Sequence, residues 1–102
     1  MRLSRAYRFF YTENEVGELT FGSFLRVARK SMELTQSEMA STLGVSKSVV
    51  CDLEKGRQLV SPRLAVKIAR KAGLSEVIAV KLCLQDQLKK AKIKMIVELQ
   101  AA

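Results

Sequence analysis

Residues 35–56 are TQSEMASTLGVSKSVVCDLEKG, and they carry the sharpest helix signals in the chain. It begins with Thr35-Gln36-Ser37-Glu38, an S/T-x-x-E capping box. In such a box the threonine hydroxyl accepts from the glutamate N–H and the glutamate carboxylate accepts from the threonine N–H. The pattern predicts a helix over 36–43, whose apolar face is Met39, Ala40 and Leu43. Gly44 follows at the position where a left-handed residue ends a helix.

A second short helix is expected over about 46–55. Ser46 can cap its N-terminus, and Gly56 follows its end. Val50 and Leu53 form its buried pair. Two short helices separated by a glycine turn have the spacing of a helix-turn-helix unit.

Amphipathic helices are expected on both sides of this unit. Phe21, Phe24, Leu25 and Ala28 form one stripe at i, i+3, i+4 and i+7, which predicts a helix over roughly 20–32. After the unit, Ser61-Pro62 supplies a cap followed by proline at the first helical position. That helix has Leu64, Ala65, Ile68, Ala69 and Ala72 as its core face and ends at Gly73. Ser75-Glu76 opens a further helix, with candidates for burial at Val77, Ile78, Val80, Leu82, Leu84 and Leu88.

The stretch 92–99, KIKMIVEL, fits two structures. Ile93, Met95, Val97 and Leu99 alternate with the residues between them, which favours a strand or an extended arm. Leu88, Met95 and Leu99 also share one stripe of a continuing helix.

Composition narrows the classes of function. The chain has 102 residues, a formal net charge of +8, no histidine and two cysteines. Residues 20–74 hold ten basic and four acidic residues, a net charge of +6. This excess favours an anionic partner, nucleic acid first. The missing histidine excludes a His-based triad or metal site, so we expect no enzyme and no cofactor. No apolar run approaches the roughly 20 residues of a membrane span, so we expect a cytoplasmic protein without a membrane partner.

The N-terminal stretch 1–19 is predicted to be an arm. Arg2, Arg5 and Arg8 lie among four aromatic residues within positions 7–11. A minor-groove arm, a disordered terminus and an edge strand all fit this composition. Docking of the aromatic residues on the protein's own body or on a dimer partner is favoured, because so many aromatics are costly to leave in water.

The stretch 35–56 resembles the lambda-repressor/Cro type of helix-turn-helix protein, the XRE family. The resemblance covers about residues 20–74. Its marks are Thr35-Gln36, Ala40, Gly44-Val45-Ser46, Val50, Leu53, Glu54-Lys55-Gly56 and Ser61-Pro62. It implies an all-α fold, a five-helix lambda-repressor-like domain with an N-terminal arm and a C-terminal helix or strand extension. The expected organisation is an arm at 1–19, a DNA-binding domain at 20–74 and a dimerisation extension at 75–102.

The resemblance also implies roles for single residues on double-stranded DNA. The second helix of the unit is the recognition helix, and its base-reading residues correspond to Lys47, Ser48, Val49, Cys51 and Asp52. Lysine can donate to guanine O6/N7, serine suits either kind of base, valine suits a thymine methyl and aspartate can accept from cytosine N4. Phosphate contacts are expected from Gln36, Ser46, Lys55 and Arg57.

Two further positions follow from the resemblance. Arg29 corresponds to an arginine that pairs with the glutamate at Glu54 and so ties the recognition helix to the core. Glu33 stands where the family often has glycine, and a left-handed glutamate would be strained by about 1 kcal/mol. We therefore expect the turn at Glu33 to adapt.

The apolar residues of the extension exceed what a small domain can bury in itself. A symmetric dimer would cover them, perhaps through paired strands at 92–99. The expected contact residues are Val77, Leu84, Leu88, Ile93, Met95, Val97 and Leu99.

Taken together, these features predict a sequence-specific repressor that binds a palindromic operator as a homodimer. A phage-type repressor and an antitoxin that also binds a toxin protein both fit this description. The alternative is a protein-binding adaptor that keeps the fold without DNA readout, which Val49, Cys51 and Asp52 favour.

Overall fold

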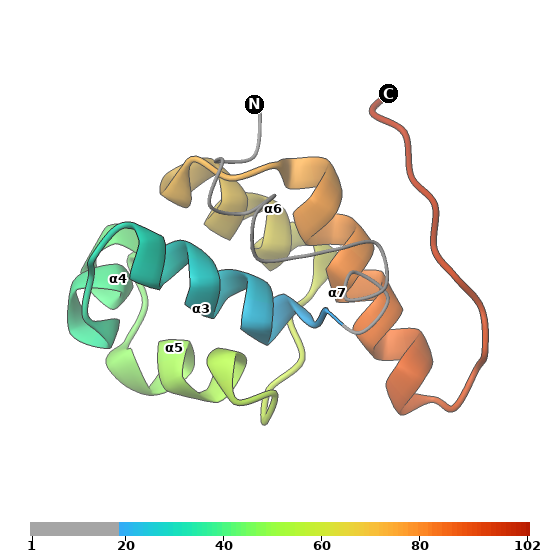
Figure 1. Cartoon of the computed structure of the whole chain (residues 1–102), viewed down its shortest axis with the longest axis horizontal. Coiled ribbons are helices and arrows are strands. Elements are labelled where there is room, and N and C mark those ends of the chain that lie inside the picture. The colour runs from blue at the N-terminus through green and yellow to red at the C-terminus, as the bar shows by residue number, and fades with distance from the viewer. Residues whose placement is uncertain (1–18) are drawn as a thin grey trace.

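The computed structural model describes residues 19–102, which form five helices and no strand (Figure 1). The all-α fold is therefore confirmed. The helices are α3 (Phe21–Ser31), α4 (Gln36–Leu43), α5 (Lys47–Glu54), α6 (Pro62–Ala72) and α7 (Glu76–Lys90). The predicted arm at 1–19 lies outside the described residues except for Leu19, which is buried in the core.

Every described helix begins at a capping side chain, and the sequence predicts four of these five caps, all but Thr20. The hydroxyls of Thr20, Thr35, Ser46, Ser61 and Ser75 each accept from a backbone N–H three residues later. The capping box of α4 is complete, with the Thr35 N–H donating to Glu38 Oε1 at 2.9 Å. This hydrogen bond lowers the pKa of the Glu38 carboxyl.

The turn between α3 and α4 differs from our expectation. Glu33 has a φ of 58°, so the turn keeps its left-handed residue and the predicted adaptation is wrong. Its neighbour Leu34 fixes the turn, because the Leu34 N–H donates to Arg29 O at 3.1 Å and the Leu34 carbonyl accepts from Arg29 Nη1 at 2.9 Å. Leu34 also packs against the core, which leaves Glu33 no room to change its backbone conformation.

All five helices contribute to a single core. The predicted apolar faces of α3, α4 and α5 are buried, and so are three of the five positions predicted for α6. The largest fully buried side chains of the core include Phe24, Leu25, Met39, Leu43, Val50, Leu53 and Ile68. Leu64 and Ala72, the other two positions on α6, are half-buried and pack against this core.

Helix α7 packs against α6 and α3 and belongs to the same core. Leu82 is buried as predicted, and so are Ala79 and Cys83, which the sequence pattern did not single out. Val77, Leu84 and Leu88 are half-buried. No helix among residues 19–102 is long and apolar enough to cross a membrane.

The chain continues after α7 as an extended arm. Helix α7 ends at Lys90, so the alternative of a continuing helix is wrong, and residues 93–102 form neither helix nor strand. Lys92, with a φ of 61°, lies at the reversal, and the Ile93 N–H closes it by donating to Leu88 O at 2.9 Å. Figure 1 shows the arm turning at the end of α7 and running back past that helix, outside the helical body.

Candidate nucleic-acid interface

Helix α5 lies at the surface of the molecule, with one face in the core and the other turned outward (Figure 1). Val50 and Leu53 anchor the inner face. Lys47 and Ser48, in the first turn, are exposed. The α5 N-terminus is capped by Ser46, whose Oγ accepts from the Val49 N–H at 3.2 Å.

The remaining predicted base-reading residues are less accessible. Val49 is half-buried and packs against the core, so only part of its side chain faces outward. Cys51 is a free thiol and half-buried, and Asp52 is half-buried. The accessible polar groups of α5 therefore gather at its N-terminal turn.

An ion pair fixes α5 to α3. Arg29 Nε donates to Glu54 Oε2 at 2.7 Å and Arg29 Nη2 donates to Glu54 Oε1 at 3.1 Å. The side chains are only 13% and 3% exposed, so the pair is shielded from water. Bidentate pairing of this kind sets orientation as well as energy. It also raises the pKa of the Arg29 guanidinium through its hydrogen bond to Glu54.

Gln36 joins the same cluster from the first turn of α4. Its Nε2 donates to Glu54 Oε1 at 3.3 Å, so one carboxylate connects α3, α4 and α5. An amide nitrogen carries two hydrogens, and this contact uses one of them. The second hydrogen remains for an external acceptor beside the α4 N-terminus, where backbone N–H groups favour an anion.

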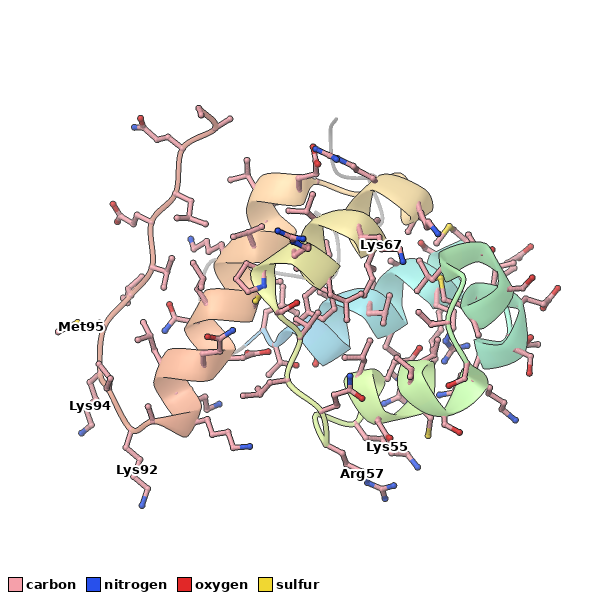
Figure 2. All side chains as sticks on the ribbon, turned by 180° about the vertical axis from the view of Figure 1, so that it is seen from behind. Lys55, Arg57, Lys67, Lys92, Lys94 and Met95 are labelled. Atoms are coloured by element: carbon pink, nitrogen blue, oxygen red, sulfur yellow. The ribbon has the colours of Figure 1, made fainter. Side chains whose placement is uncertain are left out.

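The turn after α5 carries two exposed cations. The Asp52 carbonyl accepts from the N–H groups of Arg57 at 2.9 Å and Gln58 at 3.4 Å, and Gly56 supplies a φ of 72°. This arrangement projects Lys55 and Arg57 from the end of α5, as Figure 2 shows. Arg57 Nη1 lies 4.0 Å from Asp52 Oδ1, and both groups are well exposed, so the pair is weak.

Two of the exposed cations of this face, Lys47 and Lys55, have no acidic partner in the described part of the chain. Lys67, by contrast, lies on α6 at a distance from Lys55 and Arg57 (Figure 2). Unpaired cations at both ends of an outward helix suit a polyanion of regular spacing.

Two functional positions escaped the sequence analysis. A Cβ at Gly22 would lie 2.4 Å from Leu53 O and 2.8 Å from Glu54 O, so α3 and α5 touch backbone to backbone there. Asp86, on α7, accepts from the Phe21 N–H at 2.9 Å through Oδ2 and so caps α3 from a distant helix. Burial raises the pKa of its carboxyl. Neither contact is local in sequence, so no spacing pattern could reveal it.

The predicted dimerisation residues lie on α7 and on the arm. Val77, Leu84, Leu88 and Val97 are half-buried. Ile93, Met95 and Leu99 are exposed, with exposed fractions of 43%, 66% and 37%. The described chain therefore covers the first four only in part and leaves the last three exposed.

Comparisons with known proteins agree with this geometry. A family model described as a helix-turn-helix domain matches residues 20–79, more than half of the chain. An uncharacterized HTH-type transcriptional regulator of Methanothermobacter thermautotrophicus is 43% identical over 51 residues, which cover 50% of this chain and 74% of that protein. The ImmF control region 10 kDa protein of Bacillus phage phi105 is 40% identical over 48 residues, covering 47% of this chain and 53% of that protein. No solved structure gives a significant match.

Proposed function

Since the chain belongs to the helix-turn-helix family of DNA-binding transcriptional regulators, of the XRE type, we propose that it is a repressor that binds a palindromic operator as a dimer. The observation that carries the proposal is the outward face of α5. Its N-terminal turn presents Lys47 and Ser48 without acidic partners, and the Arg29–Glu54 pair holds the helix in a fixed orientation.

In this proposal α5 enters the major groove. Lys47 donates to guanine O6 and N7, and Ser48 contacts the neighbouring base. The exposed part of Val49 meets a thymine methyl, while Cys51 and Asp52 contact the next bases along the groove. The N-terminal end of the helix makes most of the specific contacts, because its accessible polar groups gather there.

Phosphates on either side of the groove bind the groups around α5. Gln36 and Ser46 contact the backbone near the α4 and α5 N-termini, and Lys55 and Arg57 contact it at the far end of α5. These contacts set the register of the protein on DNA and carry no base information.

Dimerisation places two copies of α5 in successive major grooves. The half-sites then lie about 34–36 Å apart, one helical turn, and the operator is palindromic. The apolar groups of α7 and the arm supply the contact between the two copies, because those of α7 are only half-buried and most of those on the arm are exposed.

A phage-type control protein is the form of repressor that the second relative favours, since that relative is named as a control-region protein of a phage. An antitoxin remains the other form, and it requires a toxin gene next to this one. Inspection of the neighbouring genes separates the two.

The test is a titration of the full chain against its own upstream promoter and against scrambled DNA, at two salt concentrations. A specific repressor prefers its site by about 10³-fold or more.

Lys47→Ala should cost about 1–3 kcal/mol on the operator and relax its specificity. Lys55→Ala should weaken binding to all sequences alike and lower the salt slope by about 1 for each protomer. Lys67→Ala, on the distant part of α6, is the matched control and should change neither.

The second candidate function is the protein-binding adaptor, which Asp52 and the half-buried Val49 and Cys51 favour. The double change Lys47→Glu and Lys55→Glu separates the two functions. It should abolish DNA binding by a repressor. Weak wild-type binding that ignores sequence and disappears with salt would leave two explanations, an operator elsewhere in the genome or the adaptor. A genome-wide selection of bound fragments decides between them, and no enriched site would contradict the repressor.

A further inference from the structure

The C-terminal arm is held by the side chain of one residue of α7. Gln85 Nε2 donates to the Met95 carbonyl at 2.7 Å, and Gln85 Oε1 accepts from the Val97 N–H at 2.8 Å. A neighbouring strand in a parallel sheet makes the same two bonds, one to the carbonyl of residue i−1 and one from the N–H of residue i+1. The amide of Gln85 therefore stands in for a strand on one edge of the arm.

The other edge of the arm has no partner in the described chain. In extended backbone the N–H and C=O of alternate residues point to opposite sides. The Met95 carbonyl and the Val97 N–H face Gln85, so Ile96 faces away from it, on the same side as Lys94 and Glu98. The extended stretch begins at Lys94, where the chain makes a tight turn that the Met95 N–H closes by donating to Ile93 O at 3.1 Å. No hydrogen bond within residues 19–102 involves the backbone N–H or C=O of Lys94, Ile96 or Glu98. The Ile96 side chain is also 83% exposed.

An unpaired edge with exposed apolar groups accepts another extended chain. The charges on the edge favour a second copy of this chain as its occupant. An antiparallel pair centred on Ile96 sets Ile96 against the partner's Ile96, and it sets Lys94 against the partner's Glu98 twice, once on each side of the two-fold axis. Met95 then lies opposite the partner's Val97. Figure 2 shows Lys94 and Met95 on the outer part of the arm, clear of the helical body.

Neighbouring registers do not set Lys94 against Glu98. Shifting the centre to Met95 sets Lys94 against the partner's Ile96 and Lys92 against the partner's Glu98, a pairing that requires extended backbone at Lys92. Lys92 has a φ of 61°, which is not extended backbone. Centring on Val97 sets Ile96 against the partner's Glu98 and Lys94 against the partner's Gln100. Opposite charges directly across a pair of strands are favourable, and this selects the register on Ile96.

We propose that two copies of this chain pair their C-terminal arms antiparallel in the register centred on Ile96, and that Gln85 is the positioning residue that presents the free edge. This inference rests on the proposed dimeric repressor and specifies its interface. The odd-numbered apolar residues Ile93, Met95, Val97 and Leu99 then share one face of the two-stranded ribbon.

A charge-swap cycle on the full chain tests the register, with the dimer dissociation constant measured by sedimentation equilibrium at low ionic strength. In the Lys94→Glu variant, position 94 of each copy places a glutamate opposite the partner's Glu98. In the Glu98→Lys variant, position 98 of each copy places a lysine opposite the partner's Lys94. Each change should raise the dissociation constant about tenfold or more. The double variant restores both pairs and should return to within about twofold of the wild type.

The matched control replaces Lys92 in the same cycle. Lys92 has a φ of 61° and lies outside the paired residues in this register, so Lys92→Glu should not rescue Glu98→Lys. Rescue by Lys92→Glu in place of Lys94→Glu would overturn the register. Failure of both Lys94→Glu and Glu98→Lys to change the dissociation constant would overturn the pairing of arms.

Cross-linking gives a second measurement in a Cys51→Ser background. Cα atoms of a hydrogen-bonded antiparallel pair lie about 5.5 Å apart, within the range that a disulfide spans. Ile96→Cys should therefore cross-link across the axis, whereas two copies of Glu98→Cys would lie more than about 13 Å apart. Faster cross-linking at position 98 than at 96 would contradict the proposal.

The role of Gln85 has its own test. Gln85→Ala removes both bonds to the arm and should raise the dimer dissociation constant by about tenfold, because the free arm must then be ordered on association. Gln85→Glu keeps the acceptor for the Val97 N–H and should rescue part of the loss. Gln87→Ala is the control on the same helix, since Gln87 Nε2 bonds Val60 O and not the arm. Equal dissociation constants for Gln85→Ala and wild type would exclude the positioning role.

The outcomes also separate this inference from the function on which it rests. A wild-type dimer with an unrescued charge swap overturns the register and leaves the dimeric repressor standing. A wild-type monomer at every concentration, on and off DNA, overturns the dimer and the inference together, while the effect of Lys47→Ala still reports DNA readout.

Discussion

Glu33 is strained in the turn between α3 and α4. Its φ of 58° lies in the left-handed region, which costs a non-glycine residue about 1–2 kcal/mol. The Glu33 side chain is exposed, so no buried contact of that side chain offsets the cost. The turn survives because the hydrogen bonds of Leu34 to Arg29 hold the residue that follows it.

Replacing Glu33 by glycine should therefore stabilise the protein. We expect Glu33→Gly to raise the free energy of unfolding by about 0.5–1 kcal/mol, after the added freedom of glycine in the unfolded chain is subtracted. Urea denaturation measures the change. Glu33→Ala is the control, because it removes the charge but keeps the Cβ, and it should bring no gain. Equal stability of the two variants would contradict the strain.

Asp86 is the residue whose ionisation bears most directly on the fold. Its carboxylate caps α3 by accepting from the Phe21 N–H, and burial raises its pKa above the ordinary 3.8. The folded state therefore holds the proton more tightly than the unfolded state. By linkage, this group's contribution to stability falls as the pH rises from about 3.8 through the raised pKa.

Asp86→Asn should remove this pH dependence. The asparagine oxygen can still accept from the Phe21 N–H, and an amide carries no charge to desolvate. Relative to wild type, we expect the variant to gain stability as the pH rises from 3.8 through the folded pKa and to level off above it. Urea midpoints at several pH values measure this difference. A difference that stays constant with pH would show that Asp86 has the same pKa in both states.

At the scale of elements, the recognition helix α5 depends on how closely α3 approaches it. Gly22 makes that approach possible, because a Cβ there would lie 2.4 Å from Leu53 O. The Arg29–Glu54 pair then fixes the same two helices at the other end of α3. Both contacts meet α5 at its last residues, Leu53 and Glu54, so they fix the C-terminal end of α5 on α3.

Gly22→Ala should separate the two helices. The obstacle is backbone, which cannot move as a side chain can, so we expect a loss of about 2–3 kcal/mol in the free energy of unfolding. Binding of operator DNA by the folded variant should also weaken. Gly73→Ala is the control, because nothing lies within 4 Å of its Cβ and only its φ of 69° opposes alanine. It should cost about 1 kcal/mol and leave DNA affinity unchanged.

At the scale of the whole molecule, the helical body and the arm have separate roles. Every buried hydrophobic residue among 19–102 lies at or before Cys83. The arm at 93–102 contributes no fully buried side chain, and beyond the turn at Lys92 two hydrogen bonds to Gln85 connect it to the body. A small domain with its core complete gains little stability from such an arm.

Removal of residues 93–102 should therefore leave the body folded. In dilute solution, where dissociation is complete, we expect a melting temperature within a few degrees of the full chain. At high concentration the full chain should melt higher, because dimerisation stabilises only the folded state, and the truncated chain should not. Thermal melts at two concentrations measure both effects. A truncated chain that retains the concentration dependence would place the dimer contact on the helical body instead.

The local elements of this protein follow from the sequence by itself. Each helix start depends on a serine or threonine whose side chain accepts a hydrogen bond from the backbone N–H three residues later. The helix ends at Gly44 and Gly73 depend on the ability of glycine to adopt a positive φ. The capping box at Thr35 and Glu38 is a contact of this kind. Apolar spacing then assigns the buried face of each helix, because helical periodicity is fixed by backbone geometry.

The tertiary structure alone decided the contacts between residues far apart in the chain. Asp86 caps α3 across 65 positions, and Gly22 is required only because α5 passes beside it. The sequence predicts that the turn at Glu33 adapts, because only the local strain of a left-handed glutamate can be estimated from it. The hydrogen bonds between Leu34 and Arg29, which hold the turn, are visible only in the structure. For the arm, the alternation of residues 92–99 permits a strand, but a strand needs a partner edge. Gln85 supplies one edge through its side chain, and no local pattern specifies an edge that another part of the molecule must provide.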